Sequence, residues 1–212
     1  MGDKREVILK AAERLFSRSG FDGVSIRDIA AEAGVNSALI GYYHGSKESL
    51  YRSLFADRYA LFNEERLRLL EQTELVAYDK QCLAALVQAW SKPLLQLLQD
   101  ESNHDFIVLL SRESGEGSVD RHHIVREFFD PAAKSCMAAM GRVYPHLQQA
   151  ELALYYLWIV TPVVNFIANT QRAARLAEGR ACNLPAAPGS IDRLLTFITE
   201  GLHAAIMLNH SS

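Results

Sequence analysis

The chain has few of the residues from which disulfide-rich, redox-active or metal-binding proteins are built. Its 212 residues include three cysteines, and Cys82, Cys136 and Cys182 lie far apart with no Cys-x-x-Cys pair. A disulfide framework needs more cysteines, so we expect reduced, buried thiols in a cytoplasmic protein. Adjacent His122 and His123 would point about 100° apart on a helix with no carboxylate at the right step, so we expect no metal site.

The signatures of several common enzyme classes are also absent. The chain lacks Gly-x-Ser-x-Gly, a phosphate-binding loop, a dinucleotide fingerprint and His-Glu-x-x-His. Their absence argues against hydrolases, nucleotide-dependent enzymes and zinc peptidases of those types. We therefore expect a protein that is not an enzyme and needs no cofactor. An all-helical enzyme needs none of these motifs, however, and an adaptor that binds protein without binding DNA is a further alternative.

Long apolar segments are equally scarce. The charged start Met-Gly-Asp-Lys-Arg-Glu is followed by no apolar signal segment, so we expect no export and no membrane partner. The longest run without charge, residues 152–171, is almost as long as the ~20 residues that cross a bilayer. Pro162, Asn165, Asn169 and Thr170 interrupt this run, which favours a helix buried on several sides and kinked at the proline.

No strong excess of either charge is present. The net charge is −3, with nine Lys or Arg against eight Asp or Glu in residues 1–60 and thirteen against seventeen in the rest. This balance excludes a broadly basic protein that binds nucleic acid without specificity. A protein with this composition could read DNA only through a few well-placed cations.

The segment of residues 25–47 has the pattern of a helix-turn-helix. It reads S-I-R-D-I-A-A-E-A-G-V-N-S-A-L-I-G-Y-Y-H-G-S-K. Ser25 and Asp28 form a capping box at the start of the first helix, and Gly34 supplies the positive φ that reverses the chain. Asn36 caps a second helix of about two turns, which is long enough to enter a major groove ~12 Å wide.

Apolar residues on both sides complete a three-helix unit with its own core. Downstream, Ser46 caps a long helix whose first turns pack back onto this unit. Upstream, a stripe at helical spacing consists of Val7, Ile8, Ala11, Ala12, Leu15 and Phe16. The sequence thus predicts a helix-turn-helix DNA-binding domain over residues 1–55.

The remaining residues, 56–212, predict a larger, wholly helical domain. From Asp79 onward apolar residues recur at spacings of three and four, without the alternation of a strand. Glycine-, proline- and serine-rich breaks divide the segment into five or six helices, the last of which runs from about Ile191 to Leu208. The predicted fold class is all-α, with about nine helices in total.

Several residues of the first domain are placed to contact DNA. Ser25 and Arg27 can bind a phosphate at a helix N-terminus, although Ser25 also serves as a cap. Lys47 can bind a second phosphate or remain an ordinary solvated lysine. Ile40 should point inward, so the residues predicted to face the groove are Ser37, Ala38, Leu39, Gly41, Tyr42 and Tyr43. Ser37 is the expected hydrogen-bonding reader of a base, and an outward Leu39 suits a thymine methyl group.

The run I-L-K-A-A-x-x-L-F-x-x-x-G-F-x-x-V-S-I-R-D-I-A-x-x-A-G-V…Y-Y-H-G-S-K-E-S-L resembles the DNA-binding domain of TetR-family transcriptional regulators. It extends from about Val7 to Leu54, roughly a quarter of the chain. The rest, with L-L-S-R-E at 109–113 and D-P-A at 130–132, more loosely resembles the CecR-like subgroup. The family commonly has Y-Y-H-F where this chain has G-Y-Y-H, which leaves the operator sequence and any pH role of His44 open.

The resemblance implies a homodimer whose last two helices form the interface. Two DNA-binding domains held about one DNA turn apart, ~34–36 Å, would read a palindromic double-stranded operator. The interface residues expected on the last helix are Ile191, Leu194, Leu195, Ile198, Leu202 and Ile206. It also implies that a small-molecule effector binds the second domain and releases the protein from DNA, as in a repressor.

Aromatic residues of the second domain could line an apolar effector cavity or simply fill the core. Arg112 could orient the ligand or form a structural ion pair with Glu113. The residues predicted for ligand binding are Trp90, Phe106, Arg112, Tyr155, Tyr156, Trp158 and Phe166.

Overall fold

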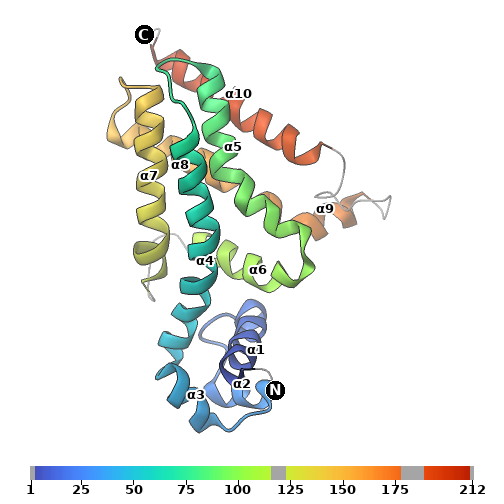
Figure 1. Ribbon diagram of the computed structural model, residues 1–212. Helices are drawn as coiled ribbons and strands as arrows, with labels where there is room; N and C mark the ends of the chain where they lie inside the picture. Colours follow the sequence, from blue (N-terminus) through green and yellow to red (C-terminus); the bar gives the residue numbers. More distant parts are fainter. Residues whose placement is uncertain (1–2, 116–122, 178–188, 211–212) are drawn as a thin grey trace. The chain divides into compact units, whose positions relative to one another are not determined.

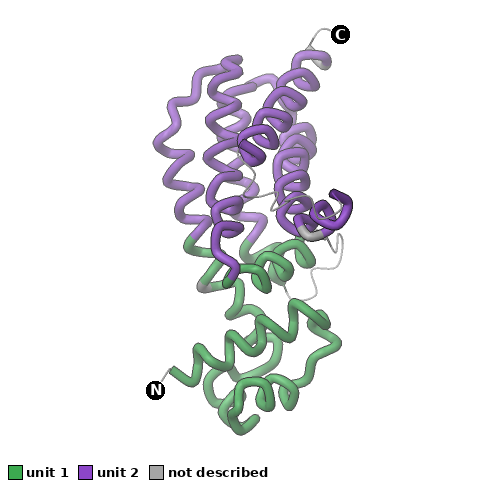
Figure 2. The backbone as a smooth tube through the Cα atoms, turned by 90° about the vertical axis from the view of Figure 1, so that its right-hand side faces the viewer, with its two compact units in different colours: residues 1–61, 102–128 green, residues 62–101, 129–212 purple. Residues whose placement is uncertain are grey.

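The computed structural model describes residues 3–115, 123–177 and 189–210 (Figure 1). These residues form ten α-helices with short 3₁₀ and π segments and contain no β-strand, which confirms the predicted all-α class. His122, Cys182 and the predicted break after Asn183 lie outside the described residues. Contacts divide the chain into two compact units, one of residues 1–61 and 102–128 and the other of residues 62–101 and 129–212 (Figure 2).

Unit 1 contains the predicted helix-turn-helix. Its helices are α1 (Lys4–Ser19), α2 (Ile26–Ala33), α3 (Ser37–His44), the first part of α4 (Lys47–Gln72) and α6 (His104–Gly115). Helix α1 packs against α2 and α6, and α2 packs against α3. The core is aromatic: the Phe16 and Tyr51 ring centres are 5.0 Å apart, and those of Phe55 and Phe106 are 6.1 Å apart.

Helix α6 is the main difference from the predicted domain limits. The sequence assigns residues 104–115 to the second domain, whereas contacts in the structure group them with the N-terminal helices. The physical reason is the burial of Phe106, Leu109 and Leu110, which are at most 5% exposed. Unit 1 is therefore discontinuous in sequence.

Unit 2 contains the end of α4 and five further helices. They are α5 (Lys80–Gln96), α7 (Asp130–Val143), α8 (Gln149–Ala168), α9 (Thr170–Leu176) and α10 (Ser190–His210). Helix α5 packs against α7, α8 and α10 and is the most deeply buried element. Together with α6, the chain after Asp79 therefore forms six α-helices in the described residues, as the spacing predicts.

Helix α8 is buried on one side rather than on several. Its inner side consists of Leu152, Tyr155, Ile159, Val163 and Ile167. On the outer side, Leu154, Leu157 and Trp158 are 45%, 52% and 45% exposed. The helix is long and apolar enough to cross a membrane, but a single helix of this kind is weak evidence for a membrane span. The expectation of burial on several sides is wrong for the single chain.

Most of the residues that were predicted to form the dimer interface on α10 pack against other helices of the same chain. Four of the six predicted residues, Leu195, Ile198, Leu202 and Ile206, are at most 6% exposed because α10 packs on α5 and α8. Ile191 and Leu194 are half-buried. The outer side instead exposes Phe197 by 70% and Leu208 by 71%. Within the single chain these four side chains pack inside, and the apolar residues that α10 leaves exposed lie on its opposite side.

Candidate DNA-binding site

Helix α2 begins at a complete capping box. The Asp28 backbone N–H donates to the Ser25 hydroxyl over 3.2 Å, and the Ser25 backbone N–H donates to the Asp28 carboxylate over 2.8 Å. A hydrogen bond from the Ser25 side chain to the Asp28 carboxyl, and then the hydrogen bond from the Ser25 backbone N–H, hold the pKa of this exposed carboxyl below its ordinary value. The start of α2 is thereby fixed as the sequence predicts.

The turn between the two helices uses the predicted residues. Gly34 has φ +64°, and its N–H donates to carbonyls of the last turn of α2. Asn36 caps α3 by accepting the Ala38 N–H at 2.9 Å. Ile40 is 1% exposed, so it anchors α3 to the core, as its inward position predicts. These contacts set which side of α3 faces outward.

The outward side of α3 carries the predicted reading residues. Ser37, Ala38 and Gly41 are exposed, and Leu39 is half-buried. The two tyrosines that follow, Tyr42 and Tyr43, are 81% and 38% exposed, and their ring centres are 5.1 Å apart. A Cβ atom added at Gly41 would meet nothing within 4 Å, so packing inside the chain does not require glycine there.

Two cationic residues that were predicted to contact phosphates, Arg27 and Lys47, come before and after α3 in the sequence. Arg27 is exposed in the first turn of α2, and Ser25 is exposed beside it. Lys47 is half-buried, with its ammonium nitrogen 4.1 Å from the centre of the Phe21 ring. His44, which stands where the family commonly has phenylalanine, is 6% exposed and belongs to the core of the unit.

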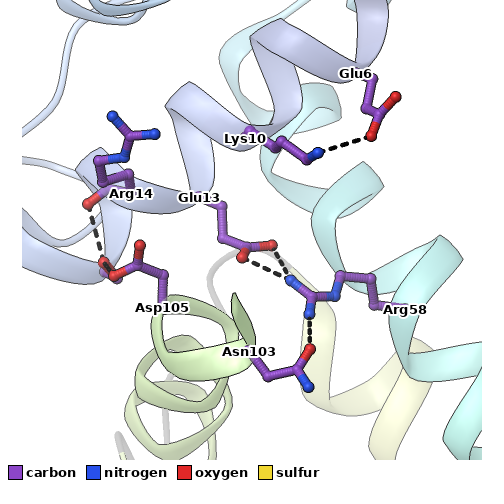
Figure 3. Close-up of polar contacts among 8 residues, drawn as sticks. Glu6, Lys10, Glu13, Arg14, Arg58, Asn103 and Asp105 are labelled. Atoms are coloured by element: carbon purple, nitrogen blue, oxygen red, sulfur yellow. Dashed lines mark hydrogen bonds and ion pairs between the residues drawn. The ribbon is translucent and has the colours of Figure 1, made fainter. Parts of the chain in front are cut away.

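A polar network ties α1, α4 and α6 together within unit 1 (Figure 3). Arg58 on α4 lies 2.6 Å from both carboxylate oxygens of Glu13 on α1 and also donates to Asn103. The Ser17 hydroxyl donates to the Asp105 carboxylate over 2.7 Å. These partners are at least 45 positions apart in the sequence, so no local pattern could reveal them.

Two further contacts involve Arg112, which was predicted to orient a ligand or to pair with Glu113, and Glu113 itself. Arg112 donates to the Ser17 carbonyl over 3.2 Å, and Glu113 accepts the Tyr51 hydroxyl at 2.5 Å. Arg112 also lies against the end of α1, where a Cβ added at Gly20 would come within 2.7 Å of its Nη1 atom. Both side chains thus attach α6 to the DNA-binding helices.

The remaining predicted ligand residues divide between the two units. Phe106 lies in unit 1, packed against Phe55. In unit 2, Trp90 and Tyr155 are 1% and 2% exposed, Tyr156 and Phe166 are half-buried, and Trp158 is 45% exposed. A hollow of about 510 Å³ that the sequence did not indicate lies between α5 and α10, lined by polar residues such as Lys80, Gln88, Thr196 and Glu200.

Comparisons with known proteins agree with this arrangement. Residues 8–54 match the model of bacterial regulatory proteins of the tetR family, and residues 88–201 match the tetracyclin repressor-like C-terminal domain. The HTH-type transcriptional repressor NicS of Pseudomonas putida is 45% identical over 65 residues, which are 31% of each chain. The HTH-type transcriptional dual regulator CecR of Shigella flexneri is 26% identical over 134 residues, 60% of this chain and 58% of CecR.

A solved structure shares the fold along nearly the whole chain. The regulator FadR of Bacillus subtilis, in complex with stearoyl-CoA, superimposes with a TM-score of 0.64 at 18% identity, covering 92% of this chain and 98% of FadR. The chain spans only about a third of the length of NicS and less than two thirds of that of CecR in their alignments. Because one of the two family models alone covers more than half of the sequence, this chain belongs to the TetR family of transcriptional regulators.

Proposed function

We propose that this protein is a ligand-responsive transcriptional regulator that binds a palindromic DNA operator as a homodimer. The observation that carries the proposal is the rigidly capped α2–α3 pair, which anchors Ile40 inside and turns small and hydroxyl-bearing residues outward. Such a helix is shaped to enter a major groove and contact base edges. The relatives named above are transcriptional regulators rather than enzymes.

The apolar sides that α8 and α10 leave exposed support the homodimer. Leu154, Leu157 and Trp158 follow one another at helical spacing on α8, and Phe197 and Leu208 lie on the outer side of α10. Exposed apolar groups of this size on a soluble protein mark a surface that another molecule covers. A second copy that presents the same two helices would bury them in a four-helix contact across a two-fold axis.

Repression with release by an effector is the regulatory mode we propose. NicS is named as a repressor, and FadR was solved with stearoyl-CoA bound. An effector acts if it binds more tightly to the state that does not bind DNA, and a coupling of ~1–3 kcal/mol gives 5- to 150-fold control. Screening by thermal shift against metabolites, antibiotics and acyl-CoA esters would find it, because a ligand at 100 times its dissociation constant adds ~2.7 kcal/mol.

The decisive test is a mobility-shift titration with the promoter region beside the protein's own gene. Binding should weaken steeply with salt, because cations that contact phosphates release counterions. Arg27→Ala and Lys47→Ala should weaken binding to all sequences and each reduce the salt slope by ~1, whereas Ser37→Ala should change which base is preferred. Lys92→Ala, at an exposed lysine of α5, is the matched control.

Two outcomes would refute the regulator. One is a protein that binds no duplex even at low salt, and the other is binding that Arg27→Ala and Lys47→Ala leave unchanged. Binding of a partner protein without binding of DNA would favour the adaptor instead.

A further inference from the structure

The start of α4 carries a lysine whose charge rests on an aromatic ring. Lys47 is the first residue of the helix and is half-buried. Its ammonium nitrogen lies 4.1 Å from the centre of the Phe21 ring. The face of an aromatic ring is negative, so the ring attracts the cation and holds it in place. A lysine without such a contact samples many rotamers, since its stem is long and flexible.

The Phe21 ring is itself held by neighbouring rings. It stacks on Phe16, with ring centres 5.7 Å apart and an angle of 15° between the planes. Tyr51 packs against it at a steep angle, with ring centres 5.1 Å apart. Phe16 and Tyr51 are 0% and 1% exposed. Because both neighbours belong to the core, the ring that carries the ammonium group is fixed in position.

Two consecutive residues of α6 hold the segments that carry these rings. Glu113 accepts the Tyr51 hydroxyl at 2.5 Å. Arg112 donates to a backbone carbonyl in the last turn of α1 over 3.2 Å, and it lies against Gly20, directly before Phe21. The position of the Phe21 ring is thus determined by contacts from α1, α4 and α6 of unit 1.

The charge of Lys47 is not neutralised in the way that the charge of Arg58 is. The Arg58 guanidinium carbon lies 4.4 Å from the Phe106 ring centre, but the group is also paired with the Glu13 carboxylate (Figure 3). In the described part of the chain, no carboxylate pairs with Lys47. An aromatic ring attracts a cation without cancelling its charge. The ammonium group has several N–H donors, so it can contact the ring and a phosphate oxygen at the same time.

We infer that Phe21 is the positioning residue for the phosphate contact of Lys47. Its ring holds the ammonium group at the start of α4 before DNA arrives, so less conformational freedom is lost on binding. Phe21 acts through the lysine. Phosphates carry no sequence information directly, so the contribution should be the same for all duplexes. The inference rests on the proposed function, because it concerns how one DNA-binding residue of the regulator is placed.

The first experiment tests the ring contact in the protein without DNA. The ring current of Phe21 should shift the ε-methylene proton signals of Lys47 upfield in proton–carbon NMR spectra. Phe21→Leu should return these signals to the range of ordinary exposed lysines, while Phe21→Tyr, which keeps the ring, should leave them shifted. Lys47→Arg removes the signals and thereby assigns them. Unshifted Lys47 signals in wild type would overturn the inference.

The second experiment is a double-mutant cycle of DNA affinity, measured by fluorescence anisotropy with the promoter duplex. Phe21→Leu should weaken binding by about two- to fivefold, which is the free energy of an exposed cation–π contact expressed as a ratio of affinities. In the Lys47→Ala background the same substitution should have no further effect, because the residue that it positions is gone. Lys10→Ala is the matched background, at an exposed lysine of α1 that pairs with Glu6, and there Phe21→Leu should cost as much as in wild type.

A further variant separates the electrostatics of the ring from its shape. Phe21→pentafluorophenylalanine keeps an aromatic ring of similar size but reverses the sign of the charge on its face. It should lose the same part of the DNA affinity as Phe21→Leu, whereas Phe21→Tyr should bind as wild type does. Thermal unfolding without DNA shows whether each variant is folded, and the two variants that keep a ring decide the test if Phe21→Leu does not fold.

Each other result contradicts the inference. An equal loss of affinity in the Lys47→Ala background would show that Phe21 acts on the fold of the domain and not through the lysine. Undiminished affinity of Phe21→Leu or of the fluorinated variant would show that the ring does not position the lysine. A loss for the operator alone, with binding to unrelated duplexes unchanged, would place the effect at the bases.

Failure of the inference can be told apart from failure of the proposed function. The NMR measurement contains no DNA, so unshifted Lys47 signals would leave the proposed regulator intact. Absence of DNA binding by wild type in the mobility-shift titration would instead refute the regulator, and the inference with it.

Discussion

The two units differ in how some of their buried polar groups are bonded. In unit 1, Arg58 is held by Glu13 and Asn103, and Ser17 is bonded to Asp105. In unit 2, the indole N–H of Trp90 and the hydroxyl of Ser91 are buried without a hydrogen-bond partner. A satisfied network holds helices in one arrangement, while unsatisfied donors favour a state in which something else meets them. The comparison separates a unit whose helices are joined by side-chain hydrogen bonds from a unit whose interior keeps some polar atoms without them.

Their outer surfaces differ as well. On α3, unit 1 exposes Tyr42 and Tyr43, which carry a hydroxyl on an apolar ring. Unit 2 exposes leucine, phenylalanine and tryptophan on α8 and α10. The first kind of surface suits a hydrated, charged partner such as DNA, and the second suits another apolar protein surface.

The largest effect should come from placing charge on the apolar surface of unit 2. Leu157→Glu or Phe197→Glu should convert a dimer into monomers, because a carboxylate buried in the contact would be desolvated without a partner. Operator affinity should then fall ~100-fold or more, since two linked half-site contacts become independent. Light scattering coupled to gel filtration measures the mass, and Leu61→Glu, at a leucine that is 70% exposed in unit 1, is the control. Dimers in both variants would contradict the assigned interface.

The second largest effect is expected from breaking the contact between Arg58 and Glu13 in unit 1. Arg58→Met should lower the free energy of unfolding by about 2 kcal/mol, because it leaves a carboxylate in a largely buried position. The Glu13 side chain is only 12% exposed. Urea denaturation measures the change. The same substitution at Arg68, which pairs with Glu65 at the surface, should cause little loss. Equal losses at the two arginines would contradict the role of the buried Glu13 carboxylate.

A smaller effect is expected from substituting Gly41 in α3, the helix that we propose enters the major groove. Gly41→Ala should stabilise the isolated protein by up to ~1 kcal/mol, since alanine favours a helix and the added Cβ meets no atom. DNA binding should nevertheless weaken, because the methyl group stands where the backbone approaches the groove. Thermal unfolding and fluorescence anisotropy with labelled operator measure the two quantities. Unchanged affinity would show that Gly41 makes no close approach to DNA.

The smallest effect is expected from removing the Asp28 carboxyl of the capping box, and it should appear in how stability depends on pH. The pKa of Asp28 is lowered in the folded state, so its contribution to stability is complete above the ordinary pKa of about 3.9 and is lost as pH falls through the lowered value. Asp28→Asn should therefore reduce stability near neutral pH and flatten its decline in acid. Thermal unfolding between pH 7 and pH 3 measures this, with Asp22→Asn at another exposed carboxyl as the comparison. Parallel curves of stability against pH for both variants and wild type would contradict the role assigned to the Asp28 carboxyl.

The sequence determined the parts of this protein whose contacts are local. The Ser25 and Asp28 box, the Gly34 turn, the Asn36 cap and the inward Ile40 all depend on residues within a few positions of one another. Helical spacing of apolar residues likewise determined the all-α class and the helices of the second half. Such features follow from backbone hydrogen bonding and periodicity, which a single chain segment contains in full.

Only the tertiary structure decided which side of a helix meets which neighbour. The apolar residues of α10 form two stripes, and the packing of α5 and α8 selected Leu195 and Leu202 for the inside and left Phe197 outside. The same holds for Arg66 and Arg68, which look alike in sequence although one is 4% exposed and the other is paired at the surface. Burial depends on residues brought together from distant parts of the chain, and local sequence carries no record of that choice.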